Sequence, residues 1–145
     1  MTTEENLKEA FAGESQANRT YLAFAKKAEE DGKPGVARLF RAVAEAETIH
    51  ALNHIKQMGK VTSTADNLKN AKEGENYEHT QMYPKMITEA ESEGNAAARI
   101  SFHYANEVEK LHENLYNEAL EKVNAGGDFT LTATPTLPLL MTMVK

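Results

Sequence analysis

The chain has 145 residues, of which 41% are hydrophobic and 26% charged, which suits one soluble domain with a single substantial core. Its net charge of -6 leaves no basic stripe to neutralise phosphates, so nucleic acid is excluded as an expected partner. Cysteine is absent, which excludes disulfides, thiolate metal sites and a cysteine nucleophile. Any metal must therefore be bound through oxygen and nitrogen.

The N-terminal residues 1–7 lack the basic and apolar regions of a secretory signal. The longest apolar stretch, residues 137–144, is far too short to span a membrane. We therefore expect a cytoplasmic protein with no membrane partner.

Four amphipathic helices are predicted by apolar residues that recur at steps of three and four. They span residues 3–31, 36–58, 66–93 and 96–124, with Asp66 as the N-cap of the third. Gly32 and Pro34 end the first helix and begin the second, because glycine favours a C-terminal cap and proline a first turn. Pro84 lies inside the third helix and predicts a kink or a local break there.

Residues 126–145 form a C-terminal tail that follows the helical domain of residues 1–125. The tail mixes threonine, proline and apolar residues without a helical period. A short strand and an extended arm on an apolar groove both remain open for it.

A Glu-x-x-His spacing occurs at Glu47 and His50 and again at Glu109 and His112, 62 residues later. On a helix this spacing puts the carboxylate and the imidazole on one face. One occurrence means little, because chance supplies about 0.7 such spacings in this composition. The repetition indicates two similar helical hairpins, whose inward faces would together form a four-helix bundle.

The predicted inward faces carry carboxylates where a bundle normally has leucine or alanine. Several ionised carboxylates cannot stay in a dry core without a cation, because desolvation costs several kcal/mol per ion. Two metal ions would neutralise them, and two histidines favour iron, manganese or zinc over calcium or magnesium. One Glu from each of two helices plus Glu-x-x-His from the other two is the pattern of di-iron and di-manganese bundles. The inward acids are Glu14, Glu47, Glu75, Glu78 and Glu109.

Single residues of this set also have simpler interpretations. His54, His79 and His103 are expected to be solvated or bound in structural hydrogen bonds rather than to bind metal. Tyr21 and Tyr83, taken singly, are typical of core aromatics. The joint pattern of the acids and the repeated Glu-x-x-His carries the metal-site interpretation.

Three motifs resemble those of the rubrerythrins. They are Gly-Glu-Ser-Gln-Ala-Asn-Arg at 13–19, Ala-Glu-Ala-Glu-Thr-Ile-His at 44–50 and Gly-Glu-Asn-Tyr-Glu-His-Thr-Gln-Met-Tyr-Pro at 74–84. The resemblance covers about residues 3–125 and implies an all-α, ferritin-like four-helix bundle. Glu78, one turn beyond Glu75, is an acid that the ferritins usually lack, and it distinguishes the rubrerythrins from them.

The resemblance also implies ligands for two iron ions, with manganese or zinc possible in a given preparation. Glu14, Glu47 and His50 would bind the first, and Glu75, Glu109 and His112 the second, with Glu47 and Glu109 bridging. Glu78 would exchange with His50 on the first iron as the redox state changes. Tyr21 and Tyr83 match tyrosines that hydrogen-bond ligand carboxylates and support catalysis.

The implied function is a non-haem di-iron peroxidase that reduces hydrogen peroxide to water and protects against oxidative stress. Iron storage or a ferroxidase of the ferritin-like class is the alternative. Many rubrerythrins carry a C-terminal rubredoxin module with four cysteines, and residues 128–145 contain none. The electrons are therefore expected from an external donor such as a rubredoxin or a reductase, unless the chain is an altered form that turns over poorly.

The connection between the second and third helices is short for a ferritin-like bundle, in which these two helices run parallel. The second helix is about 34 Å long, whereas residues 59–65 span at most about 25 Å. A domain-swapped homodimer resolves the mismatch, because the second hairpin can then pack on the first hairpin of another chain. Some short-linker rubrerythrins are built this way.

Overall fold

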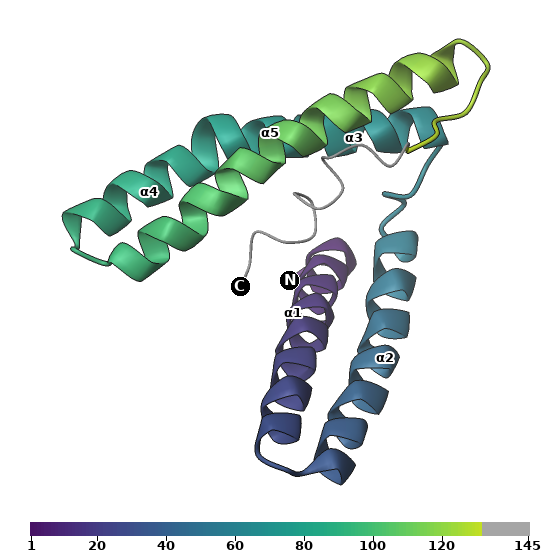
Figure 1. Cartoon of the computed structure of the whole chain (residues 1–145). Helices are drawn as coiled ribbons and strands as arrows, with labels where there is room; N and C mark the ends of the chain where they lie inside the picture. The colour runs from purple at the N-terminus through teal and green to yellow at the C-terminus, as the bar shows by residue number, and fades with distance from the viewer. Residues whose placement is uncertain (132–145) are drawn as a thin grey trace. The chain divides into compact units, whose positions relative to one another are not determined.

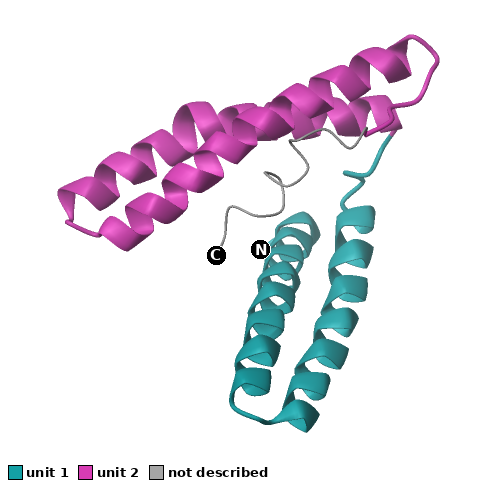
Figure 2. Cartoon of the chain, viewed as in Figure 1, with its two compact units in different colours: residues 1–62 teal, residues 63–145 magenta. Residues whose placement is uncertain are grey.

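The computed structural model describes residues 1–131 and divides the chain into two compact units, residues 1–62 and 63–145 (Figure 2). All regular secondary structure in residues 1–131 is helical, which confirms the all-α fold class. Within the same residues, no helix is both long enough and apolar enough to cross a membrane. The prediction for the tail lies outside the described residues from residue 132 on.

The first unit is a hairpin of α1 (Thr3–Glu30) and α2 (Pro34–Gln57), which lie side by side (Figure 1). Thr2 caps α1 through a reciprocal pair of bonds with Glu5, so the first free backbone amides of the helix are satisfied. Gly32 adopts a positive φ of 69° in the turn, a conformation that favours glycine. Pro34 then starts α2, as the sequence predicts.

Alanine forms the buried interface between α1 and α2. Ala25 and Ala37 are fully buried, Ala28 is nearly so, and the Phe40 ring packs on this cluster. Small side chains let the two helix backbones approach closely. No large side chain is fully buried anywhere in residues 1–131, so neither hairpin contains a deep apolar core of its own.

Asn18 provides the polar link across this hairpin. Its side-chain amide donates to the Ala44 carbonyl at 2.7 Å and to the Thr48 hydroxyl at 2.8 Å. Both acceptors lie on α2, one turn apart and just before His50. Asn18 therefore fixes the register of α1 against the turn of α2 that carries Glu47 and His50.

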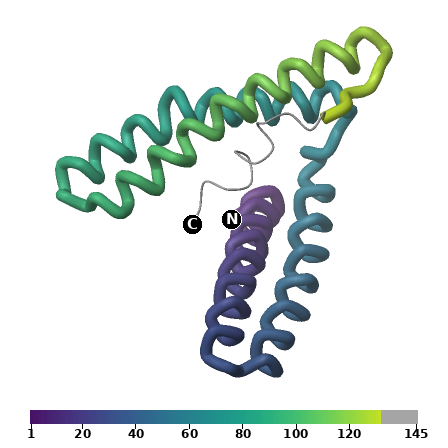
Figure 3. The backbone as a smooth tube through the Cα atoms, in the orientation of Figure 1, coloured from purple at the N-terminus to yellow at the C-terminus, as the bar shows by residue number. Residues whose placement is uncertain are grey.

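The second unit pairs a segmented helix with one long helix. The segmented side comprises α3 (Thr64–Tyr77), the π-helix η1 (Glu78–Met82) and α4 (Tyr83–Ser92), and α5 (Ala96–Asn124) runs along all three (Figure 3). The predicted N-cap Asp66 is wrong: Ser63 caps α3, and its hydroxyl oxygen accepts from the Asp66 amide at 3.1 Å. Asp66 instead accepts from the Ser63 hydroxyl within the first turn.

The break predicted at Pro84 is confirmed as the π-helix that precedes it. Proline has no N–H, so it cannot donate to the carbonyl four residues earlier. The Tyr83 N–H instead donates to the Glu78 carbonyl, five residues back, which is the bond that defines a π-helix. Glu78 is therefore the first residue of an irregular turn, a kind of segment that often occurs at functional sites.

Replacing Asn18 with alanine tests its role as the link between α1 and α2. We expect Asn18→Ala to lower the free energy of unfolding by about 1–2 kcal/mol, because two partly buried acceptors lose their donor. Denaturant unfolding followed by circular dichroism measures the change. As a control, Lys27→Ala breaks only an exposed ion pair with Asp31 and should change the same quantity by less than about 0.5 kcal/mol. Equal effects of the two substitutions would contradict the assigned role.

Candidate metal centre

The first hairpin brings Glu14, Glu47 and His50 together. The Nδ1 atom of His50 lies 2.9 Å from Glu47 Oε2 and 3.7 Å from Glu14 Oε2. One potential ligand atom from each residue lies within 4.8 Å of the other two. These three residues, called the first trio, come from α1 and α2.

The second hairpin repeats the arrangement with Glu75, Glu109 and His112, called the second trio. The Nδ1 atom of His112 lies 2.7 Å from Glu109 Oε2 and 3.5 Å from Glu75 Oε1. The near-identical geometry follows from the 62-residue repeat, because each Glu-x-x-His pair spans one turn of its helix. The structure thus brings together three of the six predicted residues in each hairpin.

The carboxylates in each trio crowd one another. Burial, together with the hydrogen bond and the charge of Glu109, raises the pKa of Glu75 to about 7. In the first trio, the hydrogen bond between the two carboxyl groups raises the pKa of Glu14 and lowers that of Glu47. Each pair therefore shares a proton more readily than two isolated glutamates would, and a cation at the same place would relieve the repulsion.

Glu78 belongs to neither trio, but it lies beside the second. Burial and the charge of Glu109 raise its pKa, while the charge of His112 lowers it. The charge of Glu78 in turn raises the pKa of Glu75. The predicted exchange of Glu78 with His50 joins the two hairpins, and it remains a prediction.

The two tyrosines occupy similar places in the two hairpins. The Tyr21 ring contacts Phe24 and Phe40, and the Tyr83 ring contacts Phe102. Burial and the charge of Glu109 raise the pKa of Tyr83. Within residues 1–131, neither hydroxyl donates a hydrogen bond to a trio carboxylate, and the predicted catalytic support by both tyrosines stays a prediction.

Two histidines outside the trios, His79 and His103, differ in their contacts and in their exposure to solvent. His79 is held in a structural hydrogen bond, with Nε2 2.6 Å from Glu113 Oε2, as one of the simpler interpretations predicted. His103 is exposed and its ring contacts Tyr104. Glu113 is a residue that the sequence reasoning missed, because it lies outside the inward faces on which that reasoning concentrated.

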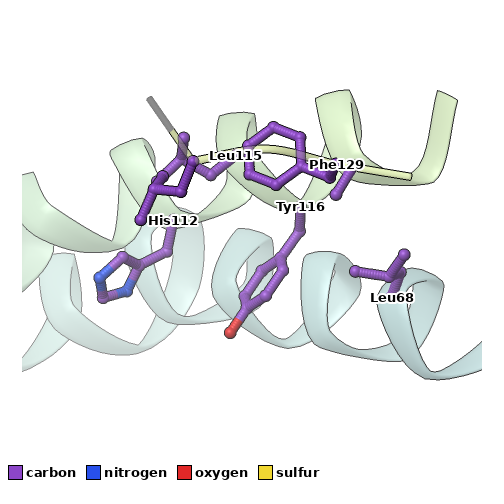
Figure 4. A pocket seen from close by; sticks show the side chains of 7 residues that line it. Leu68, His112, Leu115, Tyr116 and Phe129 are labelled. Carbon is purple, nitrogen blue, oxygen red and sulfur yellow. The ribbon is translucent and has the colours of Figure 1, made fainter. Parts of the chain in front are cut away.

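An apolar pocket of about 370 Å³ lies next to the second trio. Figure 4 shows the side chains of His112 and Tyr116 extending from α5 to the same side. Beyond them the lining is apolar and includes the chain that follows α5; the remaining lining residues are Leu68, Leu115, Ala119, Phe129 and Leu131. The polar trio therefore borders an apolar region of the same hairpin.

The donor chemistry of the two trios fits two transition-metal ions. Each trio offers two carboxylates and one imidazole, which is the mixture of oxygen and nitrogen that iron and manganese accept in helical bundles. The family model for rubrerythrin matches residues 5–120. The chain belongs to the rubrerythrin family.

Two characterised relatives illustrate the match. Rubrerythrin-2 of Clostridium acetobutylicum is 35% identical, over 89% of this chain and 78% of the relative. Nigerythrin of Nitratidesulfovibrio vulgaris is 40% identical, over 88% of this chain and 70% of the relative. A solved structure of fully reduced, all-ferrous nigerythrin is 37% identical, covers 86% of this chain and 69% of that one, and aligns with a TM-score of 0.45.

Rubrerythrins bind a di-iron centre in a ferritin-like helical bundle, and the two trios of this chain are consistent with that centre. The predictions of an all-α, ferritin-like fold and of a di-iron centre are thereby confirmed at the level of the family. Which trio atom binds which iron, and the bridging by Glu47 and Glu109, remain predictions.

The raised pKa of Glu75 predicts the pH dependence of the metal-free protein. The folded state binds the Glu75 proton more tightly than the unfolded chain does, so the stability that Glu75 contributes is fully present below about pH 4.5 and is lost as the pH rises through about 7. The raised pKa of Glu78 acts in the same direction. Urea unfolding of the chelator-treated protein at several pH values measures the slope.

Glu75→Gln is the matched variant for this measurement, because glutamine keeps the shape of the side chain without a titrating group. Its stability should fall less across the same pH range. Ferrous iron should reverse the trend in the unmodified protein, because the metal replaces the bound protons and favours the folded state at higher pH. An unchanged slope in Glu75→Gln would show that Glu75 does not cause it.

Proposed function

We propose that this rubrerythrin-family protein is a di-iron peroxidase that reduces hydrogen peroxide to water. The observation that carries the proposal is the presence of Glu78 beside a complete Glu, Glu, His trio. Glu78 is a partly buried acid in addition to the three ligands of the trio, and the resemblance to the rubrerythrins assigns such an acid to the peroxidase centre rather than to an iron store. The reaction consumes two protons and two electrons for each peroxide, giving two molecules of water.

Six residues of the chain would bind the two irons, and Glu78 would supply a proton. Glu14, Glu47 and His50 would hold one iron, and Glu75, Glu109 and His112 the other. When bound, two ferrous ions would supply the two electrons of the reaction. Glu78 is proposed to exchange with His50 as a ligand, and its raised pKa lets it keep a proton nearer to neutral pH than an ordinary glutamate.

The electrons must return to the centre from a group outside these 145 residues. No cysteine is present in them, so they cannot form the four-cysteine iron site of a rubredoxin. We propose a separate rubredoxin or reductase as the donor. The net charge of -6 favours a donor with a basic contact surface.

Anaerobic loading with ferrous iron, followed by stoichiometric peroxide, tests the proposed activity. We expect rapid oxidation of two irons per centre with water as the product. Growth of a ferric mineral beyond two irons per centre would instead support storage. Rapid oxidation by dioxygen with little response to peroxide would support a ferroxidase.

Glu78→Ala tests the extra acid in the same assay. Peroxide-driven oxidation should slow by about 10-fold to 100-fold, as for other groups that support a metal site, while two metals stay bound. Glu73→Ala is the control, because Glu73 is an exposed glutamate on α3, five residues before Glu78. Equal rates in the two variants would remove Glu78 from the mechanism.

We further propose that the complete centre forms in a domain-swapped dimer. With 24 residues, α2 is about 36 Å long. The connection to α3 is residues 58–63, which reach at most about 22 Å. In a ferritin-like bundle the second and third helices run parallel, so the connection within one chain would have to span the length of α2.

The composition of the hairpin surfaces also supports assembly with another hairpin. The buried interface of the first hairpin consists of alanines, while Phe24 and Leu39 remain 48% and 62% exposed. Burial of such side chains stabilises a bundle by roughly 25 cal/mol per Å² of apolar surface. A second hairpin from a partner chain would provide the cover.

Mixing two defective chains tests the exchange of hairpins. Glu47→Ala damages the first trio, and Glu109→Ala damages the second. In a swapped heterodimer one centre receives both intact trios, so random mixing after co-refolding should restore about a quarter of the wild-type centres. Iron content and peroxide oxidation of the mixture measure the restoration. If each chain forms its own centre, mixing will restore nothing.

A further inference from the structure

Glu113 binds two consecutive parts of the segmented helix with its two carboxylate oxygens. Its Oε1 atom accepts from the Asn76 side-chain amide at 3.0 Å, and Oε2 lies 2.6 Å from His79 Nε2. Asn76 lies in the last turn of α3, and His79 lies in η1. The carboxylate therefore spans the point at which the α-helix becomes a π-helix.

These three residues, called the Glu113 clamp, are tied to the second trio through the backbone. His79 directly follows Glu78, and Glu113 directly follows His112. Neighbouring residues on an α-helix point in directions about 100° apart, so Glu113 does not share the direction of His112. The clamp thus links the residue after Glu78 to the residue after His112. None of its side chains belongs to the second trio.

The contact between His79 and Glu113 is well shielded from solvent. Their side chains are 15% and 22% exposed, whereas those of Lys110 and Glu107, an ion pair within α5, are 47% and 45% exposed. The hydrogen bond to His79 lowers the pKa of Glu113, so the carboxylate stays charged. A charged hydrogen bond with this burial is stronger than a surface ion pair.

A π-helix needs such support, because its hydrogen bonds are less favourable than those of an α-helix. Conversion of η1 to α-helical geometry would change the direction of each following side chain by about 100°. Only a few local bonds oppose this, among them the Tyr83 amide to the Glu78 carbonyl and the Thr80 hydroxyl to the Asn76 carbonyl. Glu113 adds a contact from a different helix.

We propose that Glu113, acting through His79 and Asn76, positions Glu78 beside the second trio by holding η1 in its π-helical form. Glu113 is a positioning residue, since it contacts neither trio. The proposal rests on the proposed function only in the role given to Glu78. The geometry of η1 itself can be tested in the metal-free protein.

Hydrogen exchange of backbone amides tests the clamp directly. In Glu113→Ala the amides of residues 78–83 should exchange about tenfold faster or more, because a hydrogen bond to a charged group is lost. Glu113→Gln keeps the volume and one acceptor, so it should fold and show a smaller increase. Glu118→Ala is the control, because it removes an exposed carboxylate from the same helix, more than one turn away from Glu113. Unchanged exchange at 78–83 in both Glu113 variants would overturn the proposal.

Peroxide kinetics then test whether the clamp acts through Glu78. Glu113→Ala should slow iron oxidation, but it should cause no further slowing in the Glu78→Ala background. An equal additional loss in that background would show a general weakening of the fold and overturn the proposal. If Glu78→Ala alone has the wild-type rate, the proposed role of Glu78 fails, and the exchange measurement still decides whether Glu113 holds η1.

Discussion

The carboxylates within each trio repel one another. The rest of the structure depends on the proton or cation that relieves this repulsion. In the second trio the pKa of Glu75 rises to about 7, because Glu75 is partly buried beside Glu109. A fold gains nothing from such a pair unless a cation or a proton occupies the site. The polar helix faces are consistent with the di-iron centre of the family, and a metal bound there would favour the folded state.

Each hairpin by itself buries little apolar surface. Alanines such as Ala25 and Ala37 let two helices approach closely, but they bury little apolar surface. Larger side chains remain on the outside of each hairpin. One hairpin thus supplies one Glu, Glu, His trio and only a thin core of small side chains.

The π-helix η1 is an irregular backbone segment that contains Glu78, the acid next to the second trio. Pro84 removes one backbone donor, and the chain responds by forming a wider turn that begins at Glu78. The same turn places His79 against Glu113 on α5. The irregular turn next to Pro84 thus contains the additional acid and one of the residues that contact α5.

The sequence by itself predicted the helical segments, the break near Pro84 and the residues of the two trios, but it misplaced the N-cap of the third helix. Helical periodicity is a local property, and the spacing from Glu47 to His50 puts both side chains on one face of any α-helix. Only the tertiary structure decided the contacts that depend on the pairing of helices. Asn18 bridges to α2 and Glu113 binds His79 because antiparallel packing sets which residues lie opposite each other, and no spacing along one helix encodes that register.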